Sequence, residues 1–341
     1  MGEDLFCVAP TAPNTAEGVV GDFDGSLCLI SVAEGTASEV CKFRFGGHGG
    51  VPAGCQAVPG RRELLVADMR HGICRVDVGT GAVAQLVTEA ADATSSDGAS
   101  AMQGCNDCAL DSQGRLWVTA PAGPIAPRAY ARSETEAFGC VYLASPIPGQ
   151  SWSDPRCECT AVKVAAGFLF SNGIVVTPDK KRLVVAETVT KQLWMFDICG
   201  DGPESRLMNK RLVITVPGDH EGGPDGMDFD ADGSLVVANH GGGHIEVVDV
   251  DAKPGAPPSE DCGRLLRRVV VPFAQPSNVH FAAPPTGLTA HEAEAWRSTP
   301  AAARLYVTEH TNNAVWVSPW PAAGWPQACD ADFGLPAPPA G

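Results

Sequence analysis

Long apolar runs, helical periodicity and an excess of positive charge are all missing from this sequence. No stretch approaches the roughly 18 apolar residues that a membrane-spanning helix needs. The first ten residues carry Glu3 and Asp4 where a secretion signal would carry basic residues. We therefore expect a cytoplasmic protein that neither spans nor binds a membrane.

Positive charge is scarce: 24 Lys and Arg residues stand against 40 Asp and Glu residues, for a formal net charge of −16. This balance repels phosphate backbones and disfavours nucleic-acid binding. We expect a monomer whose partner is a small molecule.

Thirteen cysteines are present, but they do not form a convincing zinc motif. Cys105 and Cys108 have zinc-like spacing, yet no second Cys or His pair stands at a matching distance, and Cys157 and Cys159 are separated by only one residue. Without a secretion signal, we interpret the cysteines mainly as reduced, buried small side chains.

What the chain does contain is a repeat. The stretch GGPDGMDFDADGSLVV (222–237) reads as a polar step, a strand, a tight turn at Asp232-Gly233 and a second strand. Five other segments share this pattern. We call the position of the polar step in each segment its anchor, and successive anchors lie roughly 35 to 65 residues apart. These anchors are Glu17, Ala53, Asn106, Asn172, Asp225 and Asn278.

Further strands follow each hairpin, and a repeat of four strands is typical of a propeller blade. We predict an all-β, six-bladed β-propeller with four antiparallel strands per blade around a central channel, forming one domain over residues 1–341. The first few residues and the tail 335–341 are expected to fray. Thr289–Arg297 is expected to be a short helix within the insertion 284–303, and residues 91–101 are expected to form a loop.

In a propeller the first strand of every blade lines the channel, so equivalent positions converge. Five of the six anchors supply oxygen donors, and two carboxylates with two carboxamides suit a divalent cation, Ca²⁺ before Mg²⁺. The alternative is that these Asn and Asp residues only cap turns. Asp228 follows the anchor Asp225 by three residues, and His280 follows the anchor Asn278 by two. We expect these two side chains to form either a second, deeper site or a buried salt bridge.

At these residues the sequence resembles the six-bladed calcium propellers that include gluconolactonases and senescence-marker proteins, and among them most closely the diisopropyl-fluorophosphatases. The similarity runs in register through every blade from about residue 15 to 320. It is carried by GGVPAGCQ (49–56), VADMRHG (66–72), MQGCNDCALDSQGRLWVTAPAG (102–123), VAETVTKQLW (185–194), HEGGPDGMDFDADGSLVVAN (220–239), HIEVV (244–248), PSNVHF (276–281) and VTEHTNNAVW (307–316).

The resemblance implies two calcium ions. The catalytic ion would be held by Glu17, Asn106, Asn172 and Asp225, and the structural ion by Asp228, the carbonyl of Val279 and His280. Asp107 would steady the catalytic ligands. Substrate-pocket positions would be Arg132, His240 and His310.

Two departures from the family pattern make the pocket more polar: His240 replaces a Trp, and Glu134 replaces a Met. We expect them to change the preference among apolar organophosphates. The insertion 284–303 is expected to form a lid or to reshape the pocket mouth.

The resemblance therefore implies a calcium-dependent hydrolase of P–F bonds in organophosphorus triesters such as diisopropyl fluorophosphate, with Asp225 as nucleophile or general base. The alternative enzyme is a calcium-dependent lactonase of the wider superfamily. A third hypothesis, a non-catalytic calcium-binding or interaction module, is disfavoured because a scaffold has no need of an open metal site.

Overall fold

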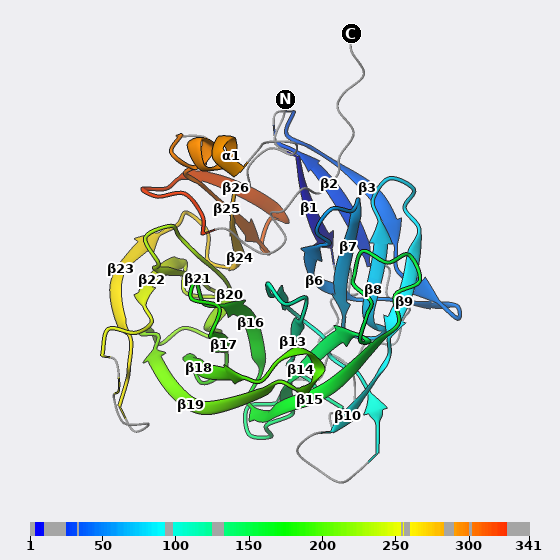
Figure 1. Cartoon of the computed structure of the whole chain (residues 1–341). Coiled ribbons are helices and arrows are strands. Elements are labelled where there is room, and N and C mark those ends of the chain that lie inside the picture. Colours follow the sequence, from blue (N-terminus) through cyan, green and yellow to red (C-terminus); the bar gives the residue numbers. More distant parts are fainter. Residues whose placement is uncertain are drawn as a thin grey trace.

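The computed structural model describes residues 4–9, 25–32, 34–92, 98–124, 133–253, 255, 260–282, 290–299 and 302–325. Six antiparallel blades stand in a ring and follow one another in sequence order (Figure 1). The predicted six-bladed β-propeller is confirmed.

Each blade runs outward from the channel in strand order, and four of the six have four strands or more in the described chain. The first two blades are β1 (Asp4–Ala9), β2 (Ser26–Ser31) and β3 (Thr36–Lys42), then β6 (Pro52–Ala57), β7 (Glu63–Asp68), β8 (Gly72–Asp77) and β9 (Val83–Val87). The third and fourth are β12 (Cys108–Leu110), β13 (Leu116–Ala120), β14 (Gly139–Pro146) and β15 (Cys159–Phe168), then β16 (Ser171–Val176), β17 (Arg182–Glu187), β18 (Gln192–Cys199) and β19 (Arg206–Thr215). The last two are β20 (Pro224–Phe229), β21 (Leu235–Asn239), β22 (His244–Asp249) and β23 (Arg264–Val270), then β24 (Pro276–Phe281), β25 (Arg304–Glu309) and β26 (Ala314–Pro319).

A few short elements decorate the ring. They are the hairpin β4 (Arg44–Phe45) and β5 (His48–Gly49), the strands β10 (Glu89–Asp92) and β11 (Ser100–Ala101), the 3₁₀ turn η1 (Gly202–Glu204) and the helix α1 (Ala290–Arg297). The helix confirms the element predicted for Thr289–Arg297. The prediction of a loop over residues 91–101 is wrong at both ends of that segment, which belong to the strands β10 and β11. Strand β10 adds in parallel to the outer strand β15 and pairs with β11.

The first blade differs from its predicted form. Strand β2 pairs with β1, from Asp4↔Ser31 to Ala9↔Ser26, whereas the repeat pattern predicts that its partner is a strand next to the anchor Glu17. The apolar stretch Leu5–Val8 gives β1 a strand-forming sequence of its own, which the repeat pattern did not reveal. The segment predicted to be the first strand lies in residues 10–24, outside the described residues, as does the tail 335–341.

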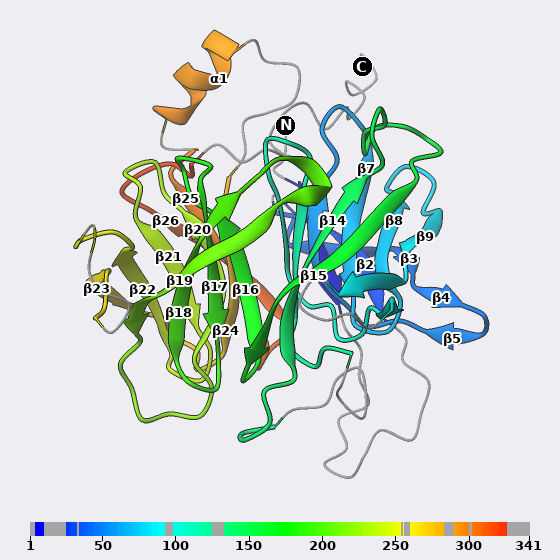
Figure 2. The ribbon, with the colours of Figure 1, turned by 60° about the horizontal axis from the view of Figure 1, so that its bottom comes forward.

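The strand register shows at which end of the ring each inner strand begins. The inner strand β24 begins at Pro276, which pairs with Glu309, and ends at Phe281, which pairs with Leu305. Helix α1 connects Phe281 to Arg304, so it stands at the end of the ring where the inner strands finish (Figure 2). We call the other end, where the inner strands β12, β16, β20 and β24 begin, the site end. The insertion is predicted to form a lid over the site, but its described helix α1 lies at the opposite end of the ring. For this helix the prediction is wrong.

Apolar side chains fill the space between neighbouring blades. Between the fourth and fifth blades, for example, Val184, Leu193 and Met195 pack against Phe229 and Val237, and all five are almost fully buried. The face-to-face packing of twisted sheets provides the core and explains why strand residues on both faces are apolar. All twelve described cysteines are free thiols, and seven of them are buried, as predicted.

Buried polar groups stabilise the turns. Asp111, which is 5% exposed, follows β12 and accepts hydrogen bonds from the backbone N–H of Arg115, the Arg115 guanidinium at 2.5 Å and the Trp117 indole at 3.0 Å. Arg115 also donates to the Ser205 hydroxyl of the next blade. The Asp111 carboxylate thus connects the turn to the second strand β13 and, through Arg115, to the neighbouring blade.

Among the described helices, none has the length and apolar character needed to cross a bilayer.

We expect Asp111→Ala to lower the free energy of unfolding by about 3–5 kcal/mol, because it leaves the buried Arg115 charge without a partner. Urea denaturation followed by tryptophan fluorescence measures this change. The control is Arg264→Gln, whose exposed contact with Asp249 spans 3.8 Å and is expected to contribute less than about 1 kcal/mol. Equal effects of the two substitutions would contradict the assigned role of Asp111.

Candidate functional site

Three of the predicted oxygen donors begin consecutive inner strands. Asn106 precedes β12 by two residues, Asn172 is the second residue of β16, and Asp225 is the second residue of β20. The inner strands pack side by side in the order β6, β12, β16, β20 and β24. The structure therefore brings Asn106, Asn172 and Asp225 to one end of the channel, as the repeat phase predicted.

Two threonine hydroxyls connect these positions. Thr119 on β13 donates its hydroxyl to the Asn172 carbonyl at 2.5 Å and accepts the Asp107 backbone N–H at 3.1 Å. Thr188, just after β17, accepts the Asn172 Nδ2 at 3.0 Å and donates to the Pro224 carbonyl at 2.8 Å. Because Thr188 engages the Asn172 amide nitrogen, the amide oxygen is directed to the other side, where it can serve as a ligand.

Glycines allow the inner strands to approach closely at this level. A Cβ atom at Gly173 would lie 2.0 Å from the Asp225 carbonyl oxygen, and one at Gly226 would lie 2.0 Å from the Asn278 Oδ1. Neither distance is compatible with a side chain. The glycine of the S-N-G sequence therefore lies against Asp225 of β20, and the glycine of the P-D-G sequence lies against Asn278 of β24.

Asp107 links two inner strands through its carboxylate. Its Oδ1 accepts the Cys108 N–H at 2.9 Å, and its Oδ2 accepts the Ile174 N–H of β16 at 3.2 Å. Desolvation raises the pKa of Asp107 to about 6; the two N–H donors and His280 oppose the rise, and the charge of Asp228 adds to it. Asp107 therefore joins β12 to β16 next to Asn106, and its role in steadying metal ligands stays a prediction.

A second cluster lies further along the same strands. The buried Asp228 of β20 contacts His280 of β24, with Oδ2 and Nδ1 2.9 Å apart. The same carboxylate accepts the Phe281 N–H at 3.2 Å and the Phe229 N–H at 2.8 Å. Val279, the third predicted member, is buried between His280 and Asn278. The structure thus brings the predicted deeper cluster together at the junction of the fifth and sixth blades.

Two histidines meet at the site end. The rings of His240 and His310 lie 5.4 Å apart at an interplanar angle of 70°. His240 follows β21 and donates its backbone N–H to Gly223, while His310 follows β25 and donates to Gln275. Each histidine is therefore fixed next to the start of an inner strand, and its role in lining a substrate pocket stays a prediction.

Two predicted residues, Glu17 and Arg132, lie outside the described residues. Sequence reasoning missed Thr119 and Thr188, because a threonine on or after a second strand has no repeat signal of its own. It also missed the capping residues that end the second strands. Asp68, Glu187 and Glu309 each accept backbone N–H groups of nearby loop residues, and their shared position in the V-A/T-D/E steps could have identified them.

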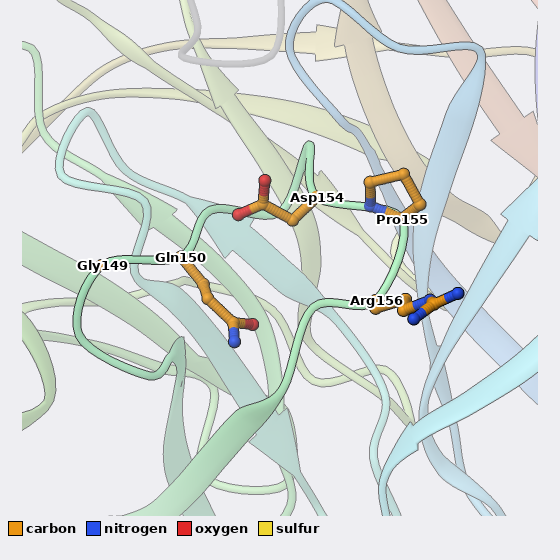
Figure 3. Close-up of a pocket in the computed structure, with 5 residues that line it drawn as sticks. All are labelled: Gly149, Gln150, Asp154, Pro155 and Arg156. Atoms are coloured by element: carbon orange, nitrogen blue, oxygen red, sulfur yellow. The ribbon is translucent and has the colours of Figure 1, made fainter.

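A shallow depression lies elsewhere, in the loop between β14 and β15 (Figure 3). It has a volume of about 400 Å³ and is lined by Gly149, Gln150, Asp154, Pro155 and Arg156. Trp152 of this loop donates its indole N–H to Gly114, in the turn that follows β12. The depression is therefore at the end opposite to Asn106 and does not belong to the candidate site.

Comparisons with known proteins agree with the architecture and the motifs. Diisopropyl-fluorophosphatase from Loligo vulgaris is 38% identical over 337 residues, which is 97% of this chain and 90% of the squid protein. Lactonase drp35 from Staphylococcus epidermidis is 30% identical over 143 residues, covering 40% of this chain and 42% of the lactonase.

Solved structures show the same fold at lower identity. A gluconolactonase from Xanthomonas campestris superposes with a TM-score of 0.57 and 21% identity over 88% of this chain and 82% of that protein. The calcium-binding protein regucalcin from Agrobacterium tumefaciens gives a TM-score of 0.56 and 17% identity over 89% and 86%. Residues 29–287 match the family described as "SMP-30/Gluconolactonase/LRE-like region". The chain belongs to the SMP-30/gluconolactonase-like family.

Proposed function

We propose that this protein is a calcium-dependent hydrolase that cleaves P–F and related bonds of organophosphorus triesters. The observation that carries the proposal is the convergence of Asn106, Asn172 and Asp225 at one end of the channel, in a chain 38% identical to a diisopropyl-fluorophosphatase. An array of oxygen donors on consecutive inner strands is suited to a hard cation and not to a purely structural axis.

The donor chemistry fits calcium. Glu17, Asn106, Asn172 and Asp225 would hold a catalytic ion through oxygen atoms, with water completing the coordination. Within the described residues, no three His, Cys, Asp or Glu side chains are grouped to hold a metal, so amide and carbonyl oxygens must contribute. Asp228, the Val279 carbonyl and His280 would hold a second, structural ion. The bound catalytic ion supplies Lewis acidity toward the phosphoryl oxygen.

Asp225 supplies the reacting carboxylate. As nucleophile, its Oδ forms a P–O bond while the P–F bond breaks and fluoride leaves; as general base, it takes a proton from the water that attacks phosphorus. The approach of Asp225 to Gly173 and the hydrogen bond from Thr188 to Pro224 hold its strand in place for either role. His240 and His310, whose rings lie 5.4 Å apart, would line the access to it.

Lactone hydrolysis is the second candidate. It is favoured by the similarity to staphylococcal lactonase drp35 and by the shared fold of the Xanthomonas gluconolactonase. The same residues would then serve a carbonyl carbon in place of phosphorus. Coverage decides the order of the two candidates, because the lactonase similarity extends over 40% of this chain and the phosphatase similarity over 97%.

We expect the calcium-loaded protein to release fluoride from diisopropyl fluorophosphate and to lose this activity when a calcium chelator is added. A fluoride-selective electrode measures the release, and hydrolysis of a small lactone is followed in parallel. Lactone turnover without fluoride release would overturn the phosphotriesterase proposal in favour of the lactonase.

Asp225→Asn should reduce turnover by about 10²–10⁴-fold, because the amide is neither a nucleophile nor a base, while folding is retained. Steady-state kinetics and the thermal unfolding midpoint measure the two effects. Asp232→Asn, at the exposed turn after the same strand, is the matched control and should keep full activity. Undiminished turnover by Asp225→Asn would remove this residue from the mechanism.

Asp228→Asn should weaken the stabilisation that calcium gives. A ligand at 100 times its Kd adds about 2.7 kcal/mol to the free energy of unfolding, so losing one ion loses that contribution. Unfolding is measured in excess calcium and in chelator for the wild type, Asp228→Asn and the Asp232→Asn control. If Asp228→Asn kept the full calcium-dependent difference, the deeper site would not bind calcium.

A further inference from the structure

Lys191 occupies an unusual position at the site end. It lies in the turn between β17 and β18, and its ammonium donates to the His220 carbonyl at 2.5 Å and the Gly222 carbonyl at 2.6 Å in the next blade. Two of its three donors are therefore used by neutral carbonyls. Because carbonyl groups carry no net charge, these two hydrogen bonds do not offset the positive charge of the ammonium.

The lysine side chain runs beside the start of β20. A Cβ atom at Gly223 would lie 3.3 Å from the Lys191 Cγ, and Asp225 follows two residues later. The backbone of Lys191 has a φ of +59°, which an ordinary side chain adopts only at a cost. A half-buried lysine is thus held beside the segment that carries the proposed reacting carboxylate.

Two histidines lie next to this lysine. A Cβ atom at Gly222 would lie 2.4 Å from the His240 carbonyl oxygen and 3.1 Å from its Nδ1, which places His240 directly against the loop that Lys191 binds. The His310 ring lies 5.4 Å from the His240 ring. An ammonium and two imidazoles, all hydrogen-bond donors, therefore lie together on the fifth- and sixth-blade side of the site end.

We propose that Lys191, His240 and His310 bind a negatively charged substituent of the substrate, so that the preferred substrates are anionic esters or lactones rather than neutral dialkyl compounds. This inference rests on the proposed function. The molecule as a whole carries a net charge of −16 and repels anions, so binding an anionic substrate requires a local positive group at the entrance. The polar His240 and the ammonium give little favourable contact to an alkyl group.

The test compares two fluoridates with the calcium-loaded full-length protein: neutral diisopropyl fluorophosphate, and an analogue in which one alkyl group carries a terminal carboxylate. We expect the wild type to prefer the anionic compound in kcat/KM. Lys191→Met should lower kcat/KM for the anionic compound by about 10- to 100-fold, mainly through KM, and change that for the neutral compound by less than about threefold. His240→Phe should shift the ratio in the same direction.

Lys180→Met is the matched control. Lys180 belongs to the same blade and also has a positive φ, +62°, but it is exposed in the turn between β16 and β17, at the opposite end of the ring. Lys180→Met should leave the ratio of kcat/KM for the anionic and neutral compounds at its wild-type value. Lys191→Arg should keep this ratio close to the wild-type value, because the positive charge is kept. A merely structural Lys191 would alter both substrates equally.

The outcomes separate the two proposals. In one outcome, the wild type and Lys191→Met release fluoride from both compounds with the same ratio of kcat/KM values. That result would overturn the anionic preference and leave the phosphotriesterase proposal intact. A wild type that releases fluoride from neither compound would overturn both.

Discussion

The close approach of the inner strands at the channel axis is the constraint on which the site depends. At the starts of β16 and β20 the backbone of one strand touches a glycine of its neighbour, at positions where a Cβ atom would stand 2.0 Å from the next strand. Removing side chains at Gly173 and Gly226 brings polar residues of successive blades within reach of one another. A ring with bulky residues at these positions would be wider and would hold the polar residues of successive blades further apart.

Hydrogen bonds between blades then fix the orientation of the converging groups. Thr119 and Thr188 connect Asn172 to the blades on either side, and Asp107 joins β12 to β16 through its two carboxylate oxygens. Thr119 lies on the second strand β13, and Asp107 and Thr188 lie directly next to β12 and β17, so the converging groups are positioned by the ends of regular strands. In the proposed account, substrate preference depends instead on turn residues such as Lys191 and His240.

The sequence predicted the architecture well because a propeller repeats. The phase of Asn106, Asn172 and Asp225 relative to six similar hairpins was enough to place them at one end of a channel. Residues without a repeat signal could not be found in this way: Thr119 and Thr188 act through hydroxyls that any polar strand residue might carry, and Lys191 matters only because the next blade supplies carbonyls to its ammonium. The insertion containing α1 was misplaced because sequence length alone does not tell at which end of a blade a loop emerges. Strand register decides that.

The most direct test of this account is the position of calcium in a crystal of the calcium-loaded protein, located from its anomalous scattering. The account predicts a peak in the channel within about 2.3–2.6 Å of side-chain oxygens of Asn106, Asn172 and Asp225. A calcium-loaded crystal with no peak at these residues would show that their convergence serves only to cap and connect the inner strands, and would contradict the account.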